Sequence, residues 1–344
     1  MRIRRSPMKT YQYPRLGLEN LALVECDEPK PAPREVVVKF HAASLNYRDL
    51  LFAEGLYNPR PNLPAVPLSD GAGEVTAVGE GVTKWQAGDR VCPAFFQGWI
   101  EGPRTAEKTR SALGAGEMDG VLREFGAFHE EGLVRIPAAL SDEEAATLPC
   151  AAVTAWHALV DIGKIKAGDT VLTLGTGGVS IFAVQFAKLH GARVIATSSS
   201  DEKLARARAL GADETINYKT TPDWEKKVLE LTGGEGVDLT LEVGGIGTLP
   251  RTMRATRYGG RVSLIGVLSG IAGDVPIGPI LHKMLQINGI YVGSHAMFAD
   301  LNRVLAQHRI EPVLDRVFDF AEMPAAFQYF QKGLHFGKVC VTFA

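Results

Sequence analysis

The pattern of apolar and polar positions changes along the chain and divides it into two kinds of sequence. Between Leu21 and about Val134, short alternating runs such as 36–40 and 73–78 are interrupted by Gly and Pro. This pattern is typical of half-buried strands joined by turns. We therefore expect an irregular, mostly antiparallel β domain in this part of the chain.

From about Ala167 onward, the apolar runs are longer and alternate with helical stretches. The runs TVLTL, RVIAT, VDLTLEV and RVSLIG predict buried strands of a parallel, doubly wound sheet. The helix expected after Gly178 carries one apolar face, formed by Val179, Ala183, Phe186, Ala187 and His190. A second helix is expected to begin at Asp201 and to end before Gly211.

Two further segments complete the expected organisation. From about Asp315 the chain returns to strand-like sequence, RVFDF and KVCVTF, around a helical segment at Pro324–Lys332, and we expect this tail to rejoin the first domain. Gln97–Gly120 is polar and lacks clear periodicity, so we interpret it as a surface lobe.

Composition narrows the class of protein. A chain of 344 residues predicts two domains. Hydrophobic residues make up 46%, charged residues 22%, and the net charge is −2, so charge indicates neither a nucleic-acid nor a membrane partner. No apolar run reaches the roughly 18 residues of a membrane span, and the four cysteines are widely spaced. We expect unpaired thiols and a cytoplasmic location, with translation starting at Met1 or Met8.

The segment GTGGVS predicts a dinucleotide-binding turn. Gly175, Gly177, Gly178 and Val179 follow the expected strand at Thr170–Leu174 and open the next helix, where free backbone amides bind a pyrophosphate. Ser180 replaces the third glycine of the usual pattern and is still small. The alternative is a glycine-rich turn in an unrelated α/β protein.

The end of the second strand favours NADP over NAD. An acidic residue at this point would hold the ribose hydroxyls of NAD, but the strand runs into Ser198, Ser199 and Ser200. Hydroxyl groups leave room for a 2′-phosphate, and Lys203 with Arg206 or Arg208 follows within two helical turns. In the alternative, Asp201 or Glu202 binds the ribose of NAD and the basic residues form a solvated helix face.

Six segments of the chain carry a family resemblance, in the order SLNYRD, SDGAGEV, AGDRV, LPCAAVTAWHAL, GTGGVS and HFGKV. Together they resemble the medium-chain dehydrogenase/reductase superfamily across nearly the whole chain. The most similar branch is the zinc-independent one, quinone oxidoreductase-like or alcohol dehydrogenase-like. The resemblance implies an α/β fold in which a Rossmann domain at 139–304 is inserted in a GroES-like, mostly β catalytic domain at 1–138, completed by 305–344.

The same resemblance implies that the zinc ions of related alcohol dehydrogenases are absent. Asn46 stands for a ligand Cys and Ser69 for a ligand His, Asp70 replaces a Glu, and only Cys150 keeps a ligand identity. Gln97–Gly120 lacks the cysteines of the structural zinc lobe. We therefore expect no zinc, and a buried core thiol at Cys150.

The resemblance also assigns cofactor contacts. Thr154 is expected to approach the nicotinamide, Tyr218 to stack near the adenosine, and Lys338 to reach a phosphate. Gly244, Gly266 and Val267 are expected to line the cofactor groove. The structural alternatives are a helix cap for Thr154, a surface aromatic for Tyr218 and an exposed strand residue for Lys338.

Without a metal, polar side chains must stabilise or protonate the reacting atoms. If the family geometry holds, we expect these groups around the vacated metal position to come from Asn46, Tyr47, Arg48 and Asp49, with Tyr57. By resemblance to enoyl thioester reductases, Tyr57 is the candidate general acid. The alternatives are loop packing for Tyr57 and a structural ion pair for Arg48 and Asp49.

The function expected is NADPH-dependent, zinc-independent hydride transfer to a quinone, enone or other activated carbonyl or alkene. Alternatives are an alcohol dehydrogenase or aldehyde reductase of the same superfamily, and a cofactor-binding protein with little turnover. The segment INGIYVGSH resembles the edge strand through which Rossmann domains of this family pair, so we expect a homodimer or a dimer of dimers.

Overall fold

The computed structural model describes residues 7–58 and 60–343, which form two compact units. Unit 1 contains the chain up to Val153 and again from Gly293, and unit 2 is the continuous stretch Thr154–Val292. Arg2, Arg4 and Arg5, which precede the alternative start at Met8, lie outside the described residues.

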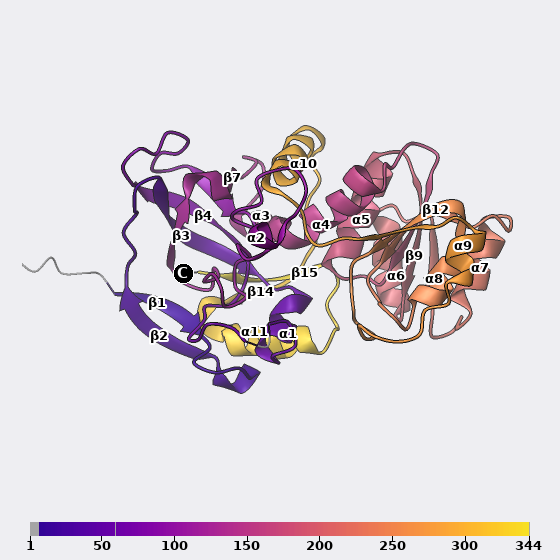
Figure 1. Ribbon diagram of the computed structural model, residues 1–344, viewed down its shortest axis with the longest axis horizontal. Helices are drawn as coiled ribbons and strands as arrows, with labels where there is room; N and C mark the ends of the chain where they lie inside the picture. Colours follow the sequence, from indigo (N-terminus) through magenta and orange to yellow (C-terminus); the bar gives the residue numbers. More distant parts are fainter. Residues whose placement is uncertain (1–6, 59, 344) are drawn as a thin grey trace, which may run out of the picture. The chain divides into compact units, whose positions relative to one another are not determined.

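Unit 1 is built around a mostly antiparallel sheet, as predicted. Its strand order is β14-β15-β3-β4-β5-β7, with β6 paired to β3, and only the β14–β15 pair is parallel. The strands β14 and β15 from the end of the chain lie beside strands from its beginning (Figure 1). The strands of this unit are β1 (Pro7–Gln12), β2 (Ala22–Asp27), β3 (Glu35–Ser44), β4 (Asp70–Val78), β5 (Arg90–Pro93), β6 (Phe125–His129), β7 (Leu133–Arg135), β14 (Leu314–Asp319) and β15 (Lys338–Thr342).

The helices of unit 1 are short, apart from two near the end of the chain. They are α1 (Tyr47–Ala53), α2 (Ala106–Thr109), α3 (Asp142–Ala145), α10 (His295–His308) and α11 (Met323–Gln331), with single turns at Leu18–Asn20, Glu130–Gly132 and Phe320–Glu322 and a π-helical stretch at Leu148–Ala152. The interpretation of Gln97–Gly120 as a surface lobe was wrong for part of it. Trp99 and Leu113 are buried, and Leu113 belongs to the main apolar core. Buried apolar residues such as these anchor an otherwise polar loop.

Unit 2 is a parallel sheet with the strand order β10-β9-β8-β11-β12-β13, which is the order of a Rossmann fold and confirms the predicted fold class. Helices lie on both sides of this sheet (Figure 1). The elements are β8 (Thr170–Leu174), α5 (Gly178–Leu189), β9 (Arg193–Ser198), α6 (Asp201–Ala209), β10 (Glu214–Asn217), α7 (Trp224–Leu231), β11 (Val237–Glu242), α8 (Leu249–Ala255), β12 (Thr256–Leu264), α9 (Gly278–His282) and β13 (Gln286–Gly289), preceded by α4 (Val153–Trp156) and a π-helical stretch at His157–Ile162.

The boundaries between the units differ from those predicted at 138/139 and 304/305. Helix α10 belongs with unit 1, because the Asn302 amide donates to Arg135 O at 2.8 Å and a ring nitrogen of His295 lies 2.8 Å from Leu133 O. Polar contacts of this kind between a helix and a strand distant in sequence leave no trace in the apolar pattern.

One helical stretch, Asp142–Ile162, is long and apolar enough to cross a membrane by length and composition. However, 78% of its most apolar window is buried inside the protein, as expected for a core helix. All four cysteines lie in the described part of the chain and none forms a disulfide, which agrees with the prediction of unpaired thiols.

Candidate active site and dinucleotide-binding turn

The first turn of α1 places Asn46, Arg48 and Asp49 at the surface of the unit 1 core. Asn46 caps the helix in an extended conformation, and the Asp49 carboxylate reaches back to accept a hydrogen bond from the Asn46 amide at 2.7 Å. Arg48 and Asp49 are only 8% and 1% exposed. Two charged side chains are therefore buried at the start of this short helix.

Lys338 brings a third buried charge to the same place from the first residue of β15. Its Nζ donates to Asn46 Oδ1 at 2.6 Å and to Leu45 O at 2.5 Å, and the residue is 2% exposed. Its ammonium is thus held by Asn46 rather than lying exposed on the strand. A contact between Lys338 and a cofactor phosphate stays a prediction.

Asp70, at the start of β4, is the fourth charge of this group. It is fully buried and accepts hydrogen bonds from Ser69 Oγ at 2.7 Å and from the Cys150 amide at 3.0 Å. Cys150 lies within the π-helical stretch Leu148–Ala152, a local irregularity that is common at functional sites. We name this group the α1 polar cluster, which consists of Asn46, Asp49, Asp70 and Lys338, with Ser69 and Cys150.

Arg48 connects this cluster to Tyr57. Its guanidinium carbon lies 4.6 Å from the ring centre of Tyr57 and 4.9 Å from that of Phe95, and its Nη1 donates to Leu113 O at 2.8 Å. The Arg48 Nη1 to Asp49 Oδ1 distance is 3.8 Å. Arg48 therefore fixes the Tyr57 ring while helping to balance the Asp49 charge.

Burial sets the protonation behaviour of the acidic groups. Desolvation raises the pKa of Asp49 to about 6, although Arg48 and the hydrogen bond from Asn46 oppose this rise. Desolvation also raises the pKa of Asp70, against the opposing effects of Lys338 and of Ser69. The pKa of the Cys150 thiol is raised for the same reason, so this sulfur is a thiol at neutral pH.

The donor atoms of the α1 polar cluster do not suit a zinc ion. Asn46 Oδ1 already accepts a hydrogen bond from an ammonium, and Ser69 Oγ donates to Asp70, so an amide, a hydroxyl and one sulfur are left as a poor ligand set for zinc. Among residues 7–58 and 60–343, no group of three or more His, Cys, Asp or Glu side chains could hold a metal ion. Cys150 is partly exposed as a residue, but its thiol is desolvated by burial, so the expectation of a buried thiol holds for the sulfur.

In unit 2, the turn after β8, where a pyrophosphate contact is predicted, has an open backbone. Gly175 adopts a φ of 73°, which side chains disfavour, and a Cβ added at Gly175 or Gly177 would meet nothing within 4 Å. Protein packing therefore does not explain the glycine at 177. Gly178 and Val179 begin α5, and the Ser180 hydroxyl donates to Leu174 O at 2.6 Å, so the residue in the third glycine position closes the turn.

The end of β9 brings together Ser198 and Tyr218, two residues assigned to the adenosine side. Tyr218 N donates to Ser198 O at 3.0 Å, and the Tyr218 side chain is 41% exposed, so its ring is available for stacking. Ser198 itself is buried, whereas Ser199 is partly exposed. Asp201, the alternative ribose ligand, accepts a hydrogen bond from Asn217 Nδ2 at 2.8 Å.

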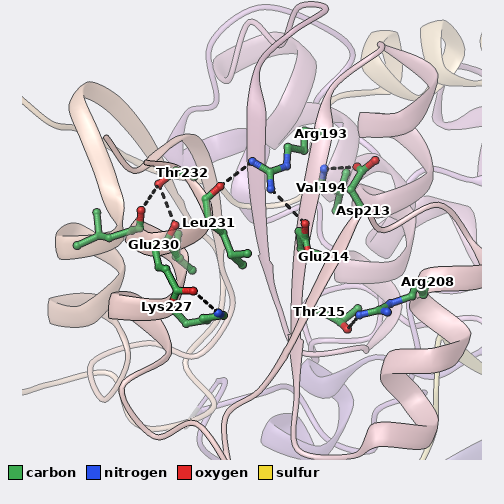
Figure 2. Close-up of polar contacts among 12 residues, drawn as sticks. Arg193, Val194, Arg208, Asp213, Glu214, Thr215, Lys227, Glu230, Leu231 and Thr232 are labelled. Atoms are coloured by element: carbon green, nitrogen blue, oxygen red, sulfur yellow. Dashed lines mark hydrogen bonds and ion pairs between the residues drawn. The ribbon is translucent and has the colours of Figure 1, made fainter. Parts of the chain in front are cut away.

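The basic residues of α6 have different roles. Lys203 is partly exposed, and its amide donates to Ser200 Oγ, which caps the helix at 3.3 Å. Arg208 instead donates to Thr215 Oγ1 at 2.6 Å, and Figure 2 shows its side chain directed to that residue of β10. A contact between either basic residue and a cofactor phosphate stays a prediction.

The remaining predicted cofactor residues lie at the start of unit 2 and in two loops. Thr154 is buried in α4, Gly244 follows β11, and Gly266 and Val267 follow β12. Gly244, Gly266 and Val267 therefore follow the carboxyl ends of two adjacent parallel strands, β11 and β12. Sequence reasoning missed the buried carboxylate of Glu242 at the end of β11, where the signal was an acidic residue ending an otherwise uncharged stretch, LTLE.

Comparisons with known proteins agree with this architecture. Residues 32–138 match the alcohol dehydrogenase GroES-like domain, and residues 178–307 match the zinc-binding dehydrogenase family. A zinc-type alcohol dehydrogenase-like protein of Schizosaccharomyces pombe is 46% identical over 331 residues, covering 94% of this chain and 95% of that protein. A quinone oxidoreductase of Pseudomonas aeruginosa is 34% identical, covering 81% of this chain and 80% of that protein.

Among solved structures, a crystal structure from Sinorhizobium meliloti 1021, assigned by its description to the alcohol dehydrogenases, superimposes with a TM-score of 0.92. It is 40% identical, and the match covers 99% of this chain and 100% of that one. The sequence motifs, the Rossmann strand order and these relatives agree: the chain belongs to the medium-chain dehydrogenase/reductase superfamily and is an NAD(P)-dependent oxidoreductase.

Proposed function

We propose that the protein is an NADPH-dependent reductase that transfers hydride to a quinone, enone or other activated carbonyl or alkene without a zinc ion. The observation that carries this proposal is the hydrogen bond between Lys338 Nζ and Asn46 Oδ1. It places a resident ammonium against the residue that stands for a zinc-ligand Cys. A metal cation beside this ammonium would be repelled.

Bound NADPH supplies the hydride, and the protein must then provide a proton for the atom that takes up negative charge. Tyr57 is the proposed donor. Arg48 lies over its ring and thereby holds the phenol in one orientation. Asn46 and Lys338 add positive and dipolar groups that favour negative charge on a substrate oxygen.

Replacing Tyr57 with Phe tests this role. We expect kcat to fall by about 10²–10⁴-fold, the usual contribution of a general acid, with NADPH affinity nearly unchanged. Tyr258→Phe is the matched control, because Tyr258 is 63% exposed and no catalytic or cofactor role is predicted for it. Equal kcat in wild type and Tyr57→Phe on the best substrate would remove Tyr57 from the mechanism.

The preference for NADPH rests on the end of β9. Asp201 is engaged by Asn217, and no acidic residue occupies positions 198–200, whereas Ser199 and Lys203 are partly exposed there. Substituting Ser199 with Asp should therefore shift the preference toward NADH, since a carboxylate repels the 2′-phosphate and binds ribose hydroxyls.

An alcohol dehydrogenase or aldehyde reductase is the second candidate, favoured by the names of the most similar relatives. One panel separates the two: oxidation of NADPH and NADH with quinones, enones and aldehydes, reduction of NADP and NAD with alcohols, and zinc quantification on the same samples. Zinc in stoichiometric amount whose removal abolishes activity would contradict the metal-free proposal.

The unpaired thiol of the exposed Cys26 supports a reducing compartment, and we propose the cytoplasm.

A further inference from the structure

Glu242, the last residue of β11, is a buried carboxylate that anchors a turn. It is fully buried, and its Oε1 accepts hydrogen bonds from Gly244 N at 2.7 Å, Gly245 N at 3.0 Å and Thr248 Oγ1 at 2.7 Å. Its Oε2 accepts a further bond from Thr252 Oγ1. A buried carboxylate is stable only with such donors, so the charge and the turn require each other.

The anchored turn is interlocked with the loop that follows β12. Ser269 donates to Gly244 O from its amide at 2.7 Å and from its hydroxyl at 2.6 Å, and the same hydroxyl accepts a bond from Gly247 N at 2.9 Å. The amides of Ile265 and Gly266 both donate to Glu242 O, at 2.8 and 3.1 Å. The two loops therefore form a single hydrogen-bonded unit.

Packing leaves these loops little freedom. A Cβ at Gly266 would lie 2.0 Å from Val243 O, and one at Gly245, where φ is 91°, would lie 2.7 Å from Gly270 O. Both contacts are with backbone atoms, which cannot turn aside. Packing therefore sets the backbone positions of Gly245 and Gly266 closely.

The position of the loop pair in the sheet indicates what it contacts. Strand β8 carries the Gly175 turn and lies between β9 and β11, so the strand order reverses at this point. In such sheets one half binds each mononucleotide at the carboxyl ends of the strands. The half formed by β8, β9 and β10 carries the adenosine residues Ser198 and Tyr218, which leaves the half formed by β11, β12 and β13 for the nicotinamide mononucleotide.

We infer that Glu242 is a positioning residue for the nicotinamide half of the cofactor, holding the Gly244–Gly245 turn where backbone can approach the ribose and ring. The inference rests on the proposed dinucleotide cofactor and adds the residue that shapes one half of its site. Glu242 acts through the turn and does not itself touch the reacting atoms.

Binding of a whole cofactor compared with binding of its adenosine fragment tests this inference. In Glu242→Gln, we expect the Kd for NADPH to rise about tenfold or more, the effect of losing a hydrogen bond to a charged group, and the Kd for 2′,5′-ADP to stay within about twofold. Ser269→Ala should have the same effect in weaker form if Glu242→Gln proves unstable. Glu230→Gln is the matched control, because Glu230 is exposed and pairs only with Lys227 among the contacts drawn in Figure 2.

Thr248 provides a rescue test with a milder change. Thr248→Val removes one donor to Glu242 and should weaken the binding of NADPH but not that of 2′,5′-ADP. Thr248→Ser keeps the hydroxyl and should restore wild-type affinity for NADPH. Equal NADPH affinity in wild type, Glu242→Gln and Thr248→Val would overturn the inference, as would an equal loss of both ligands in every variant. If the wild-type protein binds neither ligand, the proposed cofactor is wrong instead.

Discussion

Four buried charges meet at the start of α1, in the α1 polar cluster and the neighbouring Arg48. Asp49 and Asp70 balance Arg48 and Lys338, and each carboxylate accepts at least one hydrogen bond from a neighbouring amide or hydroxyl. Replacing a buried ion pair with apolar residues of the same volume is often neutral or stabilising, so such groups are poor contributors to stability. Their presence here fits the proposed role in chemistry.

Asp49 gives a pH-dependent prediction. Its folded pKa of about 6 lies above the ordinary 3.8, so in this range the folded state binds more protons than the unfolded state, and stability falls as pH rises. We compare the free energy of unfolding of wild type with that of Asp49→Asn. The difference between them should decrease by about 2–3 kcal/mol as pH rises from about 4 to about 6, at about 1.4 kcal/mol per pKa unit.

Denaturant unfolding at a series of pH values measures this difference, and subtracting the variant removes the contributions of all other groups. Asn keeps an oxygen that can accept the Asn46 amide, so the helix cap is preserved. A flat difference would show that the pKa of Asp49 is the same in the folded and unfolded states, and a difference that grows with pH would show that folding lowers it; either result contradicts the prediction.

Lys338→Met should be strongly destabilising. Removing the ammonium leaves Asn46 Oδ1 and Leu45 O without their donor and leaves two buried carboxylates facing one cation, which costs about 3–5 kcal/mol when a buried pair is broken. Denaturant unfolding gives this value, and Lys332→Met, at an exposed lysine, is the control. A variant with wild-type stability and weaker NADPH binding would favour the phosphate contact instead.

Sequence predicted the chemistry of individual residues better than their environments. NYRD placed Asn46, Arg48 and Asp49 together, but helical spacing does not reveal that Arg48 and Asp49 are buried. Lys338 resembles an exposed strand residue, and its partner Asn46 lies 292 positions away. Glu242 is an ordinary strand end until the turn that surrounds it is known.

At the scale of elements, the strand, turn and helix around Gly175 followed directly from the sequence. The period of the apolar residues and the glycine positions both act locally, so the pattern contains what is needed. The sequence pattern did not predict the boundaries between the units, because α3 and α10 join unit 1 through contacts with distant strands. Long-range polar contacts of this kind decide boundaries that local patterns leave open.

Asp142 shows how one such contact stabilises an element. The first residue of α3 accepts bonds from Arg90 on β5, with Nη2 at 2.5 Å, and lies 2.8 Å from His41 Nδ1 on β3. The hydrogen bond with His41 and the contact with Arg90 lower the pKa of Asp142, so its contribution to stability is present above the ordinary pKa and is lost as pH falls through the folded value.

We therefore expect Asp142→Asn to lower the free energy of unfolding by about 2 kcal/mol at neutral pH, the range for hydrogen bonds to charged groups, and by much less in acid. Asp223→Asn, which removes an exposed pair with Lys226, should change the free energy of unfolding much less, because solvent screens an exposed pair. A loss for Asp142→Asn that persists unchanged at low pH would mean that shape, not charge, carries the effect.

At the scale of the whole molecule, the outer edge of the unit 2 sheet is the place where a second copy would bind. Strand β13 is the last strand in the order, and four neighbouring apolar side chains are more than two thirds exposed: Ile271, Ile277, Leu281 and Met284, at 86%, 74%, 74% and 71%. An exposed edge with apolar residues beside it invites pairing. We propose a homodimer through this edge.

Light scattering during size-exclusion chromatography tests the proposed dimer. The double variant Ile277→Glu and Leu281→Glu should be monomeric at concentrations at which wild type is a dimer, because burying two carboxylates opposes association. NADPH binding should persist, since neither residue belongs to the predicted cofactor contacts. A wild-type monomer, or a variant that remains dimeric, would place the contact elsewhere or exclude it.

The order in which the chain is made bears on the position of Lys338. Unit 2 is one continuous stretch and contains all the strands of its own sheet, so it can fold as soon as it leaves the ribosome. Unit 1 cannot, because β14 and β15 occupy one side of its sheet and follow unit 2 in the chain. The ammonium that completes the α1 polar cluster is thus synthesised after the whole of unit 2. A chain that stops short of β15 would still form the dinucleotide turn but would lack the group that holds Asn46, so incomplete products are expected to be cofactor-binding and inactive.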